Sequence, residues 1–141
     1  MSYHHPIMQL PNHLQKFSSA TLLIASDTVM AKFFLLGGEA MEELDGIAVP
    51  REPSQDNEGG LASEVRDEPR LHDFIHQLVE RTDHLVQSHA IARIFLVMPA
   101  AVERPFTGHL SEETSSKILK TLNKDLMNEA PLTIVERVLE A

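Results

Sequence analysis

One stretch of this sequence constrains the fold more than any other: an amphipathic run that leads directly into a short apolar segment. Between Leu71 and Val86, apolar residues recur at intervals of three and four, which is the spacing of one face of an α-helix. Residues 94–98 follow and contain no polar side chain. A strand without polar alternation is buried on both faces, as a central strand is. The stretch therefore predicts a helix that covers a strand inside a sheet.

Before this unit, three short strands predict an antiparallel meander. The Ser-Asp-Thr triplet at residues 26–28 and the Gly37-Gly38 pair provide residue types that favour tight turns between strands. Residues 1–19 are expected to form an N-terminal lead-in, either irregular or with a short edge strand near Met8. The three strands of the meander are expected at residues 20–25, 29–36 and 39–49.

The composition changes between residues 50 and 69, where no apolar periodicity is present and acidic residues exceed basic ones. This pattern predicts a mobile acidic loop, since a stretch of this length without secondary structure is unusual in a compact domain. The helix is expected to begin only after Pro69. Its polar face carries His72, His76, Glu80, Asp83, His84 and Gln87.

After the central strand, residues 99–107 predict an irregular turn with a short helix broken at Pro105. Ser111 is a good N-cap for the next short helix, because Glu112 and Glu113 favour a helix N-terminus. Residues 118–126 either continue that helix or form a further strand. Pro131 then opens a last helix at its first position.

The order of elements predicts one α/β domain over residues 20–141, with a ribonuclease H-like arrangement. In this arrangement, a three-strand antiparallel meander is followed by parallel strands that are joined through crossover helices. A chain of 141 residues, 43% of them hydrophobic, is long enough to bury a single core.

Composition excludes several classes of function. Asp and Glu total 21 against 12 Lys and Arg, and the resulting formal charge of -9 disfavours nucleic-acid binding by a general attractive field. The absence of cysteine excludes disulfides and thiolate catalysis. No segment reaches the ~20 apolar residues of a membrane span, and no Lys or Arg precedes an apolar run at the start. We therefore expect a cytoplasmic protein without a signal peptide or membrane contact.

A metal site is weakly indicated by His72 and His76, which lie four residues apart on one helical face with Glu80 continuing the row. Two imidazoles at this spacing can reach one metal ion. The zincin motif, however, needs Glu directly after the first His, and here Asp73 follows it. A solvated polar face explains the row better, and we expect neither a metal nor a cofactor.

The sequence names no reaction. A two-metal nuclease would need several carboxylates that converge, but Asp27 lies in a predicted turn and residues 94–98 contain no acid. The chain has no Gly-x-Ser-x-Gly elbow and no phosphate-binding Gly-x4-Gly-Lys loop. A basic neighbourhood of candidate phosphate contacts is formed by Arg104, Lys117, Lys120 and Lys124. A solvated face is the alternative interpretation of this neighbourhood.

Several short motifs resemble the bacterial host attachment protein family, whose members are described as required for attachment to host cells. The matching residues are Pro99, the His-Leu-Ser triplet at 109–111 and the Leu-Asn-Lys-Asp-Leu run at 122–126. The hairpin at residues 24–34 is similar to the Ala-Asp and Phe pattern that opens the family. The resemblance covers residues 20–139.

That family is in turn similar to the middle domain of archaeal and eukaryotic class-one peptide release factors. In those domains, a Gly-Gly-Gln loop between the third strand and the long helix enters the peptidyl-transferase centre. The resemblance places Gly59-Gly60 in this loop, but Leu61 stands where the Gln would be. The candidate functional loop therefore comprises Asn57, Glu58, Gly59 and Gly60.

The resemblance implies a non-catalytic binding module that associates with the ribosome or with tRNA. The alternative is a hydrolase that acts on peptidyl-tRNA or RNA through the Gly59-Gly60 loop. A third hypothesis is a homo-oligomer that assembles through the edge of the meander.

Overall fold

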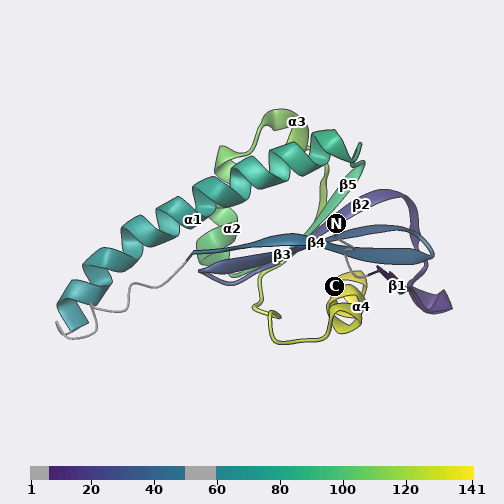
Figure 1. The fold of residues 1–141 in the computed structure, drawn as a ribbon, viewed down its shortest axis with the longest axis horizontal. Helices are drawn as coiled ribbons and strands as arrows, with labels where there is room; N and C mark the ends of the chain where they lie inside the picture. The colour runs from purple at the N-terminus through teal and green to yellow at the C-terminus, as the bar shows by residue number, and fades with distance from the viewer. Residues whose placement is uncertain (1–6, 50–59) are drawn as a thin grey trace, which may run out of the picture.

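The computed structural model describes residues 7–49 and 60–141, and within these ranges it forms one mixed sheet with helices on both faces (Figure 1). Helices α1 and α2 cover one face, and α4 covers the other. In chain order, the elements are β1 Ile7–Gln9, the 3-10 turn η1 Asn12–Leu14, β2 Phe17–Ser26, β3 Met30–Gly38, β4 Ala40–Ala48, α1 Gly60–Ser88, β5 Arg93–Val97, α2 Ala100–His109, α3 Glu112–Ser115, β6 Ile118–Leu122 and α4 Pro131–Glu140.

The order of strands confirms the predicted fold class. The sheet runs β1-β4-β3-β2-β5-β6, and β2, β3 and β4 form the antiparallel meander. Strand β5 lies parallel to β2 on one side, with Leu23 opposite Phe95, and parallel to β6 on the other. The apolar strand is therefore inside the sheet, as its lack of polar alternation predicts.

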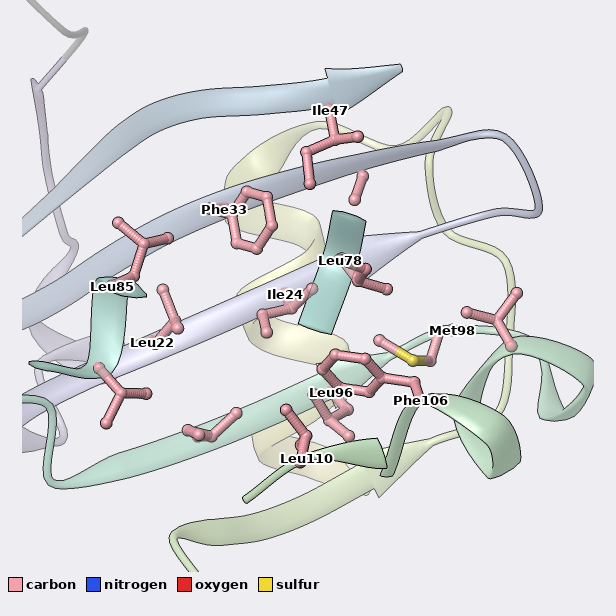
Figure 2. Close-up of a cluster of buried hydrophobic side chains, with 14 of the residues drawn as sticks. Leu22, Ile24, Phe33, Ile47, Leu78, Leu85, Leu96, Met98, Phe106 and Leu110 are labelled. Carbon is pink, nitrogen blue, oxygen red and sulfur yellow. The ribbon is translucent and has the colours of Figure 1, made fainter. Parts of the chain in front are cut away.

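The two faces of β5 belong to two separate cores. Ile94 and Leu96 face the cluster beneath α1 and α2, where Figure 2 shows Leu96 close to Phe106. Phe95 and Val97 face the cluster beneath α4. All four side chains are at most 4% exposed, so each face of this strand contributes hydrophobic stabilisation.

Residues 7–19 contain the short edge strand that the sequence predicts near Met8, and they pack against the sheet. Strand β1 pairs antiparallel with the start of β4, with Met8 opposite Met41. Leu10, Leu14 and Phe17 are buried in the cluster beneath α4. Burial of these three side chains outweighs the usual looseness of a chain end. Strand β1 also occupies part of the meander edge that the homo-oligomer hypothesis leaves open.

Two predictions about the helices are wrong: the start of the long helix after Pro69 and the break at Pro105. Helix α1 begins at Gly60 and contains Pro69, so the predicted loop of residues 50–69 is helical in its second half. Residues 50–59 lie outside the described ranges. The segment before Pro69 contains Ala62, Glu64 and Arg66, which have high helix propensity.

Helix α2 likewise continues through Pro105 instead of breaking there. Its buried side chains, Val102 and Phe106, flank Pro105 along the helix. The Thr107 hydroxyl donates to the Glu103 carbonyl oxygen at 2.9 Å, which adds a local hydrogen bond across the proline. Packing of the helix against the core therefore outweighs the hydrogen bond lost at the proline.

The C-terminal elements settle the alternative that the sequence left open. Residues 118–122 form strand β6, and a bulge interrupts its pairing with β5: Ile94 lies opposite Ile118, but Phe95 lies opposite Lys120. Leu119 is the extra residue and is 57% exposed. This bulge explains the imperfect alternation in the sequence, and it protects an edge strand against pairing with other chains. The predicted Ser111 cap of α3 and Pro131 start of α4 are both confirmed.

We predict that Thr82→Val raises the stability of the protein. Thr82 is fully buried in α1, and its hydroxyl has no hydrogen-bond partner among the described residues. Replacing an unsatisfied hydroxyl by a methyl group of similar size should raise the free energy of unfolding by about 1 kcal/mol. Thermal unfolding measures the change.

Thr114→Val is the matched control. Thr114 is 3% exposed, and its hydroxyl donates a hydrogen bond to the Asp83 carboxylate at 2.6 Å. This substitution should lower the melting temperature, because it removes the shorter of the two hydroxyl hydrogen bonds to the Asp83 carboxylate. Destabilisation by both substitutions would contradict our interpretation of Thr82.

Candidate functional site

The most distinctive feature of the molecule is that α1 extends beyond the sheet it covers. The helix spans Gly60–Ser88, a length of about 43 Å at 1.5 Å per residue. In Figure 1, its N-terminal end reaches well past the strands, whereas its C-terminal half lies over them. Gly60 stands at this outer end, and the other candidate loop residues, Asn57, Glu58 and Gly59, lie outside the described ranges.

The C-terminal part of α1 is fixed by apolar packing against the sheet. Phe74 and Leu78 are fully buried, and Leu85 is 8% exposed. Figure 2 shows Leu78 and Leu85 over the side chains of the central strands, with Leu85 near Leu22. Each such side chain contributes about 1.5–3 kcal/mol on burial. The helix therefore has one firmly packed end and one end that extends outward.

A bulge in β4 provides a polar contact to the same helix. The pairing of β3 and β4 shifts between Ala31 and Phe33, next to Gly46. The carbonyl of Asp45 accepts a hydrogen bond of 2.8 Å from the Arg81 guanidinium, which also lies 5.9 Å from the centre of the Phe33 ring. A cation over an aromatic ring is favourable. Arg81 thus joins α1 to the irregular part of the sheet.

A second polar contact joins α1 to α3. The Asp83 carboxylate accepts from the Thr114 hydroxyl at 2.6 Å and from the Ser111 hydroxyl at 3.3 Å. The Ser111 hydroxyl oxygen also accepts from the Thr114 amide at 3.1 Å, which caps α3. Sequence reasoning placed Asp83 on the solvated face and missed this network. A signal was present, because Asp83 lies one helical turn from Val79 and Val86, two apolar positions of the amphipathic pattern.

The histidine row lies on the exposed side of α1, as predicted. His72 and His76 are exposed, and the His76 Nε2 atom lies 3.5 Å from Glu80 Oε2. Across the described residues, no three His, Asp or Glu side chains are placed to hold one metal ion. Glu80 and His84 instead line a shallow hollow of about 280 Å³ with Ile47.

We predict that added zinc or nickel leaves the melting temperature unchanged. Two exposed imidazoles and a carboxylate already in contact with one of them offer little pre-organisation to a metal ion. The His72→Ala variant should therefore melt at the same temperature with and without the metal. If the metal raised the melting temperature of the wild-type protein but not that of His72→Ala, a metal site at His72 would be established and our prediction would be wrong.

The candidate phosphate contacts are spread over different parts of the molecule. Lys117 precedes β6 and Lys124 follows it, so a strand of about 16 Å separates them. The Lys120 ammonium donates to the carbonyls of Val138, Leu139 and Ala141 at 2.9–3.4 Å, where it caps the end of α4. Arg104 is exposed on α2. The sequence pattern grouped these residues, but Lys120 is engaged in a structural contact.

Asp27 has the geometry of a turn residue. Its Oδ1 atom accepts hydrogen bonds from the amides of Val29 and Met30 at 2.8 and 2.7 Å. Both bonds stabilise the turn between β2 and β3. This arrangement accounts for Asp27 without a metal-dependent role.

Comparisons with solved structures show which folds this chain is similar to. No family model matches the sequence, and no curated protein matches it. Among solved structures, an archaeal translation termination factor, aRF1, superposes with a TM-score of 0.56 at 14% identity over 84% of this chain and 37% of that chain. An "archaeal protein" superposes with a TM-score of 0.54 at 16% identity over 86% of this chain and 35% of that one.

At these identities, the likeness is one of fold, and this chain spans about a third of the length of either structure. It supports the expected fold. Membership of the host attachment protein family stays a prediction. Among the described residues, no helix combines the length and the apolar character needed to span a lipid bilayer.

Proposed function

We propose that this chain is a non-catalytic module that docks onto the ribosome through the outer end of α1. The observation that carries the proposal is the form of α1: one end is packed on the sheet, and the other extends beyond it with Gly60 at its start. The similarity in fold to a translation termination factor supports this proposal. A rigid helix that projects from a stable domain can present a short segment to a recessed surface.

The absence of catalysis in this proposal rests on the residues beside Gly59 and Gly60. The resemblance to release factors implies a Gln after the glycine pair, and Leu61 follows it here. A leucine side chain can neither donate nor accept a hydrogen bond, so it cannot orient water or a carbonyl group. The host attachment resemblance is consistent with a related module that has lost this chemistry.

The net charge constrains how such docking works. With a formal charge of -9, the chain is repelled by RNA at long range. Binding must then depend on local contacts, for which Arg104, Lys117 and Lys124 are the candidate phosphate partners. Few phosphate contacts give a shallow dependence of affinity on salt, because few counterions are released.

Co-sedimentation with ribosomes across a salt series tests the proposal. We expect the protein to pellet with ribosomes at low salt and to be released at high salt. Gly60→Glu adds a negative charge at the outer end of α1 and should reduce pelleting. Gln87→Glu makes the same change in charge at an exposed position near the other end and should leave pelleting unchanged.

Failure to pellet at the lowest salt, or equal losses in the two variants, would refute docking through this end of α1. Binding to free tRNA, assayed in parallel, distinguishes a tRNA partner from the ribosome. The alternative function, a peptidyl-tRNA or RNA hydrolase, predicts release of product that is lost on substitution of Gly59 or Gly60. Turnover of peptidyl-tRNA or RNA would refute the non-catalytic binding module and favour the hydrolase.

A further inference from the structure

A separate hollow of about 340 Å³ lies at the opposite end of α1 from Gly60. Residues of β1, β2, β3 and β4 line it, and His89, directly after α1, closes one side. Its volume falls within the range of small-molecule sites in proteins, about 300–1,000 Å³. Neither the proposed docking end nor the candidate phosphate contacts take part in it, so this inference is independent of the proposed function.

The hollow arises from a bulge in β2. Phe17 lies opposite Gly38, but the next paired residue, Thr21, lies opposite Leu36. Three residues of β2 therefore face the single residue Gly37 of β3, and the strands separate locally. A Cβ atom added to Gly37 would meet no atom within 4 Å, which shows that the space beside this backbone is open. Bulges frequently shape functional sites.

The lining combines apolar walls with hydrogen-bond acceptors. Leu35 and Ile7 provide apolar surface, and Ile7 is 69% exposed. Ser18 and Ser19 line the same hollow. An apolar surface beside a few polar groups is the usual composition of a ligand site.

Charge selects the kind of ligand. Glu42 contributes a carboxylate to the lining, and none of the described lining residues is Lys or Arg. Glu42 has another interaction partner, but a carboxylate has about four acceptor positions, so a further donor can bind. An anionic ligand would be repelled here. We propose that the hollow binds a small molecule with an apolar body and a protonated primary amine.

In the proposed complex, the apolar body packs on Leu35 and Ile7, and the ammonium group donates to the Glu42 carboxylate. The probe for a test is 2-phenylethylamine, with phenylacetate as a control of similar size and opposite charge. Backbone amide shifts in two-dimensional NMR spectra, recorded on the full chain, report which residues respond. We expect saturable shifts at Ser18, Ser19 and Gly37 with the amine, and binding of phenylacetate weaker by about fivefold or more.

Two variants make the test specific. Gly37→Leu should fill the hollow without a backbone clash and abolish the shifts, and its melting temperature verifies that the fold is intact. Glu42→Gln keeps the size of the side chain and should reduce the preference for amine over acid. The proposal is overturned if the two probes bind equally, if Gly37→Leu still binds the amine, or if the shifts map to another surface.

Discussion

Phe74→Ala is expected to lower the free energy of unfolding by about 3–5 kcal/mol. Phe74 is fully buried where α1 begins to pack on the sheet, in the cluster that also contains Phe33 and Phe106. Truncation removes the transfer free energy of an aromatic ring and leaves a cavity between a helix and a sheet that cannot easily close. Chemical denaturation measures the loss as a lower midpoint with an unchanged slope.

His76→Ala provides the control for this prediction. His76 lies two residues further along α1, and its side chain is 66% exposed. Its substitution should change stability by less than about 0.5 kcal/mol. Comparable losses in the two variants would mean that α1 does not pack on the sheet through Phe74. The premise of a helix with one anchored end would then fail.

The same comparison separates stability from docking. A variant weakened at Phe74 loses the support for the whole helix, so its ribosome binding should fall together with its stability. Gly60→Glu should reduce binding with little change in melting temperature, since an acidic side chain is favourable at a helix N-terminus. Measuring both quantities for both variants shows whether the outer end of α1 acts directly or only through the fold.

The predictable part of this fold is the part that local patterns encode. Residues 94–98 predicted a buried parallel strand, and β5 is that strand. A run without polar residues is stable in a sheet only where both of its faces are buried. Ser111 predicted a cap and Pro131 a helix start, since both effects act within one turn of a helix.

Contacts between distant segments could not be read from the sequence. Lys120 appeared as a candidate phosphate contact, but its ammonium caps the end of α4 through the Val138 carbonyl, 18 residues further along the chain. Arg81 reaches the Asp45 carbonyl beside a bulge in β4, and a bulge leaves only an irregular alternation in the sequence. The pairing of β1 with β4 likewise depends on burial of Leu10 and Leu14, which short local windows do not reveal.

Gly46→Ala is expected to lower stability by about 2–3 kcal/mol, which corresponds to a fall in melting temperature of about 6–10 °C. A Cβ atom at this position would lie 2.6 Å from the carbonyl oxygen of Ala31. That oxygen belongs to the backbone of β3, so relief requires the two strands to move apart. The movement would also displace the Asp45 carbonyl from Arg81 and loosen the polar contact between β4 and α1.

Gly37→Ala is the matched substitution in the same sheet. Its Cβ atom meets nothing within 4 Å, so the change should be neutral or stabilise by about 0.5 kcal/mol through reduced freedom of the unfolded chain. Thermal unfolding of the two variants separates a steric effect from a general cost of replacing glycine in a strand. If Gly46→Ala proved as mild as Gly37→Ala, β4 could not approach β3 as closely as described. The bulge would then no longer account for the contact of Arg81 in α1 with the Asp45 carbonyl in β4.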